Sequence, residues 1–143
     1  MEFVDYYEEI GFSKIQIDKI YEINRYATLL CPEQIIDVFV NDYLQQDKTK
    51  AFDSAWFFAK GYVLEAKRFL EKEVDLDITP INKKVMYIGI KAKDYNFKKA
   101  SDNSQIEVDV IVLGDTICSY KATSSNCDYL MDIISKYYKT NLF

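Results

Sequence analysis

The stretch from Lys84 to Ala122 constrains the fold more than any other part of the chain. It contains three runs, VMYIGIKAK, IEVDVIVL and TICSYKA, in which apolar and polar residues alternate with the period of a β-strand. The alternation predicts three antiparallel strands joined by two hairpin turns, the second at Gly114 and Asp115. The side chains expected to face inward from the first two strands are Met86, Ile88, Ile90, Ala92, Ile106, Val108, Val110 and Val112.

Charge predicts the register of the first hairpin. A turn centred near Ala100 places Lys91 opposite Asp109. The same register places Lys93 opposite Glu107, so that two pairs of opposite charge lie across the strands. Hydrophobic pattern and charge therefore favour the same hairpin.

Two amphipathic helices are predicted before the strands. The first ends at Gly11, which can take the left-handed conformation, and its apolar stripe is Phe3, Tyr6, Tyr7 and Ile10. The second covers residues 14–29 and begins with a capping box formed by Ser13 and Gln16. Its stripe consists of Ile17, Ile20, Ile23, Asn24, Ala27 and Leu30.

A third helix is predicted after the last strand, where it closes the domain. Ser124 or Ser125 caps this helix, and its stripe is Cys127, Leu130, Met131, Ile134, Tyr137 and Tyr138. The length of 143 residues suits one domain, so residues 1–143 are expected to fold together. Within them, residues 1–30 form a helical arm and residues 31–143 a β domain that ends in the helix.

Residues 32–73 fit two interpretations. As helices, their apolar residues keep a helical spacing behind Pro32 and Ser54. As strands, their aromatic and β-branched runs are separated by Lys60 and Gly61, which suit a hairpin turn. Periodicity alone leaves both open.

Taken as strands, the chain resembles the pleckstrin-homology-like domain, in which seven strands precede one C-terminal helix. Leu29, Glu33 and Ile35 resemble the entry into bacterial versions of that domain, and the likeness covers residues 29–140. It favours strands for the ambiguous stretch. The expected fold is therefore α+β, with N-terminal helices, an antiparallel barrel of this kind or a meander, and a C-terminal capping helix. The alternative is four N-terminal helices packed on a three-stranded meander.

The resemblance implies a protein-binding scaffold. In members that bind phosphoinositides, the loop between the first two strands carries a basic cluster. Here that loop holds Lys48 and Lys50 beside Asp47, which departs from the basic pattern.

The residue types argue against catalysis. Because the chain has no histidine, it cannot build a Ser-His or Cys-His nucleophile pair. Asp75 with Asp77, or Glu107 with Asp109, could offer paired carboxylates, but such alternating positions are expected to face solvent. The four glycines form no phosphate-cradling motif. We therefore expect no enzyme activity, no cofactor and no metal.

The sequence also indicates the cellular compartment and the redox state of the cysteines. The acidic N-terminal sequence differs from a secretory signal, and no apolar run is long enough to cross a membrane, so a cytoplasmic protein is expected. Three cysteines without metal-ligand spacing, Cys31, Cys118 and Cys127, are expected to be reduced and mostly buried.

Two segments could bind partners. The acidic-aromatic arm, defined as Asp5, Tyr6, Tyr7, Glu8 and Glu9, could dock on a basic protein surface. The lysine-rich hairpin, with Tyr87 and Phe97 nearby, could bind a phospholipid headgroup or nucleotide through Lys91, Lys93, Tyr95, Lys98 and Lys99.

Charge decides which segment is preferred. Residues 1–47 carry ten acids and three bases, a net charge of −7, whereas the remainder carries +2. The overall charge of −5 argues against nucleic acid. We therefore expect a binding protein for a basic protein partner, of the inhibitor or immunity type found in bacteria or phage. The oligomeric state is left open.

Overall fold

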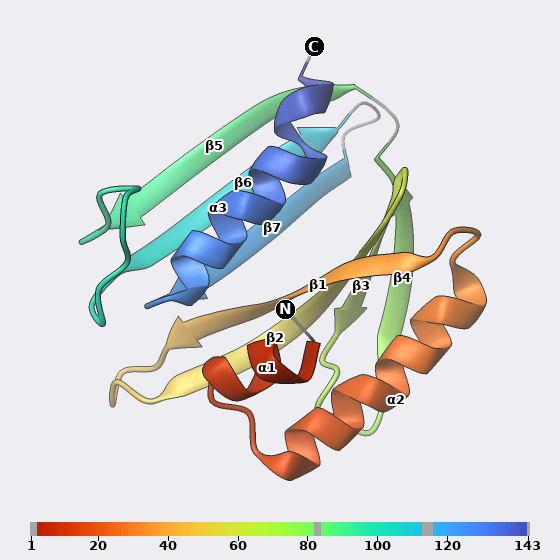
Figure 1. The fold of residues 1–143 in the computed structure, drawn as a ribbon, viewed down its shortest axis with the longest axis horizontal. Coiled ribbons are helices and arrows are strands. Elements are labelled where there is room, and N and C mark those ends of the chain that lie inside the picture. Colours follow the sequence, from red (N-terminus) through yellow and green to blue (C-terminus); the bar gives the residue numbers. More distant parts are fainter. Residues whose placement is uncertain (1–2, 82–83, 113–115, 143) are drawn as a thin grey trace. The chain divides into compact units, whose positions relative to one another are not determined.

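The protein is α+β, as the sequence predicted (Figure 1). The structure is a computed structural model that describes residues 3–81, 84–112 and 116–142. Its helices are α1 (Phe3–Glu9), α2 (Lys14–Leu30), α3 (Asn126–Tyr137) and the 3-10 helix η1 (Lys139–Asn141). Its strands are β1 (Ile35–Leu44), β2 (Lys50–Ala59), β3 (Tyr62–Lys67), β4 (Asp75–Pro80), β5 (Val85–Lys93), β6 (Gln105–Val112) and β7 (Thr116–Thr123).

The described strands form two separate antiparallel meanders. One sheet has the order β1-β2-β3-β4 and the other the order β5-β6-β7, so neighbours in each sheet are also neighbours in the chain. The described residues therefore do not close into the predicted barrel, and each of the two sheets is a meander. The predicted turn at Gly114 and Asp115 lies outside the described residues.

Contacts divide the chain into two compact units. Unit 1 consists of residues 1–40 and 53–80, and unit 2 of residues 41–52 and 81–143. Strands β1 and β2 each contribute residues to both units. Each unit is described by itself below.

The ambiguous stretch is made of strands. Positive φ at Gly61 (79°) forms the predicted turn between β2 and β3, where a side chain would be strained. Six consecutive residues at the end of β2, from Ser54 to Ala59, are buried. Because both faces of β2 are covered, the residues show no alternation, and this is why periodicity could not distinguish a strand from a helix.

The helices of unit 1 follow the predicted boundaries closely. Gly11 follows α1 with φ of 94°, and the capping box of Ser13 and Gln16 starts α2. The predicted stripe of α2 is buried at Ile20, Ile23 and Ala27. Leu30, also predicted on that stripe, is 57% exposed, because α2 makes its buried contacts on a narrower face.

In unit 2, α3 lies across one face of the β5-β6-β7 sheet (Figure 1). Buried residues of α3 include Cys127, Leu130, Ile134 and Tyr137, as predicted. Ser125 takes the predicted N-cap position, although its side chain makes no capping hydrogen bond. We call the sheet face under α3 the inner face and the opposite one the outer face.

The inner face is only partly as predicted. Ile106, Val108, Val110 and Val112 of β6 are all buried. On β5, however, Ala92 is exposed, as are Met86 and Ile90. A bulge between Val85 and Tyr87 turns Val85 inward in place of Met86, and β5 is an edge strand, so its inner side chains are covered on one side only.

The register of the first hairpin is shifted by two residues from the prediction. Lys91 lies opposite Glu107, and Asp109 lies opposite Gly89. Lys93 lies opposite Gln105. A shift of two keeps every side chain on its predicted face, so the pattern could not reveal the error.

All three cysteines are buried free thiols, as predicted. Burial, followed by the nearby Asp42 and Asp128 carboxylates, raises the pKa of Cys127 to about 12. Its Sγ donates a hydrogen bond to the carbonyl of Ala122 at 3.4 Å. The Cys127 thiol therefore stays protonated at neutral pH and packs the interior instead of acting as a nucleophile.

Candidate binding surfaces

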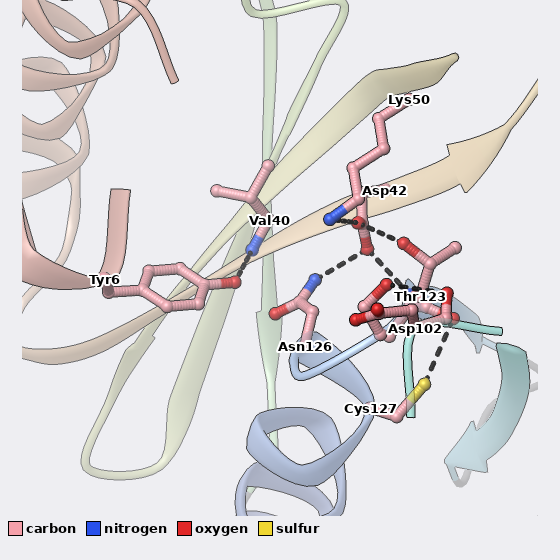
Figure 2. A network of polar contacts seen from close by, with 10 residues as sticks. Tyr6, Val40, Asp42, Lys50, Asp102, Thr123, Asn126 and Cys127 are labelled. Atoms are coloured by element: carbon pink, nitrogen blue, oxygen red, sulfur yellow. Dashed lines mark hydrogen bonds and ion pairs between the residues drawn. The ribbon is translucent and has the colours of Figure 1, made fainter. Parts of the chain in front are cut away.

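The acidic residues of the acidic-aromatic arm are exposed, whereas its two tyrosines are buried. Asp5, Glu8 and Glu9 are exposed on α1. Tyr6 and Tyr7 are buried in unit 1, and Tyr7 is 0% exposed. The backbone N–H of Val40 donates to the hydroxyl of Tyr6 at 2.9 Å (Figure 2), so this ring anchors β1. The two tyrosines hold the fold of unit 1, and only the three carboxylates face solvent.

A different part of unit 1 exposes apolar side chains, namely the solvent side of α2. Ile15 is 81% exposed and Leu29 is 83% exposed, and Tyr26 and Leu30 are also exposed. Ile15, Tyr26 and Leu29 are separated by eleven and three residues, spacings that keep them on one helical face. We call Ile15, Tyr26, Leu29 and Leu30 the α2 stripe.

The α2 stripe borders a groove. Two hollows of about 430 Å³ and 410 Å³ adjoin along it and share Lys19 and Lys72. Their opposite wall is the segment from Leu70 to Leu76, which leads into β4. The larger hollow is lined mainly by apolar side chains, whereas the smaller one combines Ile15 and Leu70 with polar and charged side chains. Sequence reasoning missed this groove, because Leu30 was assigned to the core and Leu29 to the strand entry.

Unit 1 is strongly acidic. It contains fourteen acidic and seven basic residues, a net charge of −7, whereas unit 2 has nine acidic and eleven basic residues and carries +2. Several of the bases of unit 1 are already paired: Lys19 with Glu22, Lys67 with Asp77, and Arg68 with Asp75. The asymmetry seen along the sequence is therefore also an asymmetry between the units.

The predicted anion-binding residues separate into two groups in unit 2. Lys91 and Lys93 line a hollow of about 240 Å³ on the β5-β6-β7 sheet. Tyr95, Lys98 and Lys99 lie in the loop that follows β5. This loop is tied to α3, because the hydroxyl of Tyr95 donates to Asp128 at 2.6 Å. Burial, and then this carboxylate, raises the pKa of Tyr95 well above its usual value.

The lining of the hollow also contains Lys121 and Tyr43, which the sequence did not suggest as binding residues. Lys121 of β7 lies two strands from Lys91 in the same row, with Glu107 between them. The ammonium group of Lys121 lies 5.3 Å from the centre of the Tyr43 ring, a cation–π contact that fixes its position. Because Tyr43 lies in β1 and Lys121 in β7, their contact could not be predicted from the sequence.

One wall of the hollow is built around Asp42, whose carboxylate is completely buried. It accepts hydrogen bonds from the backbone N–H of Thr123 at 2.9 Å, from its hydroxyl at 2.6 Å, and from the amide of Asn126 at 2.8 Å (Figure 2). The ammonium group of Lys50 lies 3.8 Å from the same carboxylate. These donors compensate the buried charge, so Asp42 serves as a structural link within unit 2.

Three of the four predicted paired carboxylates take part in ion pairs or hydrogen bonds within the fold. Asp75 pairs with Arg68 at 2.6 Å, and Asp77 with Lys67 at 3.3 Å, on the exposed side of β4. Asp109 accepts a hydrogen bond from Ser119 at 2.8 Å. Across residues 3–81, 84–112 and 116–142, no three carboxylate or thiol side chains are grouped to hold a metal ion.

Comparison with known proteins identifies no relative. No protein-family model, no curated protein and no solved structure matches the chain. In the part of the chain that the structure describes, no helix has the length and apolar character needed to cross a bilayer. A function therefore has to be inferred from the residues of the chain itself.

Proposed function

We propose that this chain is a non-enzymatic protein-binding module that binds a basic protein partner through unit 1. The observation that carries the proposal is the α2 stripe beside its groove. Large aliphatic side chains that are more than four-fifths exposed, such as Ile15 and Leu29, gain free energy when a partner covers them. Partners bury such residues in grooves between helices and neighbouring segments.

The charge of unit 1 determines the chemistry of the partner. A net charge of −7 repels a second copy of the same surface and attracts a cationic one. The occupant is therefore a protein that presents lysines or arginines around apolar anchor residues. This chemistry suits an inhibitor or immunity-type accessory protein, and the scaffold role implied by the pleckstrin-homology-like resemblance is compatible with it.

Removing the two leucines of the α2 stripe is expected to weaken partner binding at least tenfold. Leu29→Ala with Leu30→Ala deletes exposed anchor side chains without opening the core, since both residues are exposed. The tagged full chain is used to capture partners from its native lysate, and the captured protein is purified and titrated calorimetrically. A partner that is basic, binds in fixed stoichiometry and binds the double variant at least tenfold more weakly supports the proposal.

The control is Ile117→Ala, which removes an aliphatic side chain that is 61% exposed from β7 in unit 2. It should leave the affinity unchanged. The proposal fails if the control and the double variant weaken binding equally, or if the captured protein is acidic. It also fails if light scattering shows that the chain is a dimer and that the double variant is a monomer.

Charge reversal on α1 is expected to slow association. Glu8→Lys with Glu9→Lys changes two exposed carboxylates that make no buried contact, so the association rate for the basic partner should fall about tenfold at low salt. The dissociation rate should change little, and the difference should shrink as salt is added. Surface plasmon resonance at two ionic strengths measures both rates. An unchanged association rate would remove α1 from the binding surface.

A further inference from the structure

A second binding surface lies on the outer face of the sheet in unit 2, where side chains with different chemistry follow one another along β5. Tyr87, Gly89, Lys91 and Lys93 alternate on this face. In the neighbouring strand β6, the residues opposite them are, in the same order, Ile111, Asp109, Glu107 and Gln105. The face is thus apolar and aromatic at one end and basic at the other.

The aromatic end is a platform built on a glycine. A Cβ atom at residue 89 would lie 2.7 Å from Cε1 and 2.8 Å from Cζ of Tyr87, so the ring lies directly over the backbone of Gly89. The Tyr87 side chain is about half exposed, so part of the ring is accessible to a ligand. An exposed ring lying on a sheet is the arrangement on which planar rings of ligands stack.

The basic end is the hollow of about 240 Å³ described above. Its charged lining consists of Lys91, Lys93, Lys121, Glu107 and Asp42. Asp42 is compensated by its own buried donors and by Lys50, so the lining has more lysines than remaining carboxylates. Among the described residues, Lys91 and Lys93 enter no ion pair within the fold, and their charges are available to an anion.

The two ends are spaced for one small ligand. Side chains two residues apart on a strand are separated by about 7 Å, so a ring stacked over Gly89 would lie about 7 Å from the Lys91 position. Between them, Asp109 accepts one hydrogen bond from Ser119 and keeps acceptor capacity for a ligand hydroxyl or amine. The required ligand therefore has a planar ring, a polar middle part and an anionic end.

The geometry points to a mononucleotide site on the outer face of the β5-β6-β7 sheet. Tyr87 stacks on the base, Asp109 accepts from the sugar or the base, and Lys91 and Lys93 hold the phosphate with Lys121. The site lies in unit 2 and involves none of the residues assigned to the protein partner, so either proposal can fail without the other.

Calorimetric titration of the full chain with AMP, ribose 5-phosphate and inorganic phosphate tests the site. AMP is expected to bind about tenfold more tightly than ribose 5-phosphate, because one stacked base adds roughly that factor. Lys91→Ala with Lys93→Ala should weaken AMP binding at least tenfold. Tyr87→Ala should weaken AMP and leave ribose 5-phosphate unchanged, which a general loss of folding would not do.

The matched control is Lys98→Ala with Lys99→Ala, which removes the same charge from the exposed loop after β5. It should leave AMP binding unchanged. Equal losses in the two double variants would show that only the overall charge matters and would overturn the site. AMP binding no tighter than that of inorganic phosphate would overturn it too, as would binding of a single-stranded oligonucleotide without measurable binding of AMP.

Discussion

Replacing Asp42 with alanine is expected to lower the free energy of unfolding by about 3–5 kcal/mol. The change leaves the backbone N–H of Thr123, its hydroxyl and the amide of Asn126 without their acceptor in the interior of unit 2. Buried donors that lose a charged acceptor keep their desolvation cost and gain nothing in return. Urea denaturation followed by circular dichroism measures the loss.

The control for this prediction is Glu107→Ala, which removes a carboxylate from the lining of the same hollow. Glu107 is exposed, so its removal should change the free energy of unfolding by no more than about 0.5 kcal/mol. Asp42→Asn should fall between the two, because the amide oxygen can still accept while the amide nitrogen faces other donors. A loss below about 1 kcal/mol for the alanine variant would contradict the structural role of Asp42.

Replacing Tyr7 with alanine is expected to lower the free energy of unfolding by about 3–5 kcal/mol. Its side chain is completely buried, and its ring centre lies 5.7 Å from that of Phe12 and 5.8 Å from that of Tyr21. The ring therefore joins α1 and the turn after it to α2, and its removal leaves a cavity where these elements meet. Thermal and urea unfolding measure the effect.

Tyr26→Ala is the matched control, because Tyr26 belongs to the α2 stripe and is half exposed. The control should alter stability by no more than about 0.5 kcal/mol while weakening partner binding. The pair of variants separates the two possible roles of tyrosine in unit 1. If Tyr7→Ala unfolded like the wild-type protein yet lost the partner, the acidic-aromatic arm would be a docking surface after all.

Most of the fold could be predicted from local patterns. Alternation located β6 and β7, the Ser13–Gln16 capping box located the start of α2, and the turn residues Lys60 and Gly61 separated β2 from β3. The errors arose on β5, an edge strand that pairs with β6 as predicted. Side-chain alternation fits registers that differ by two residues equally well, and it does not reveal a bulge such as the one beside Val85.

The binding surfaces were harder to predict than the fold, because a stripe of apolar residues does not reveal which of its members are covered. Tyr6 and Tyr7 were assigned to a partner and lie in the core, whereas Leu30 was assigned to the core and faces solvent. Of the predicted anion-binding residues, Lys91 and Lys93 line the same hollow. Lys121 comes from a strand thirty residues farther along and required the sheet pairing to be found.

The long separation between Asp42 and its hydrogen-bond donors also affects how the chain is made. Thr123 follows Asp42 by 81 residues and Asn126 follows it by 84. At a synthesis rate of about 5–20 residues per second, roughly 4–16 seconds pass before the ribosome has added them. During that interval the carboxylate has none of these donors, so unit 2 can be completed only after residue 126 has been added. A premature stop before residue 123 would leave Asp42 with none of these donors.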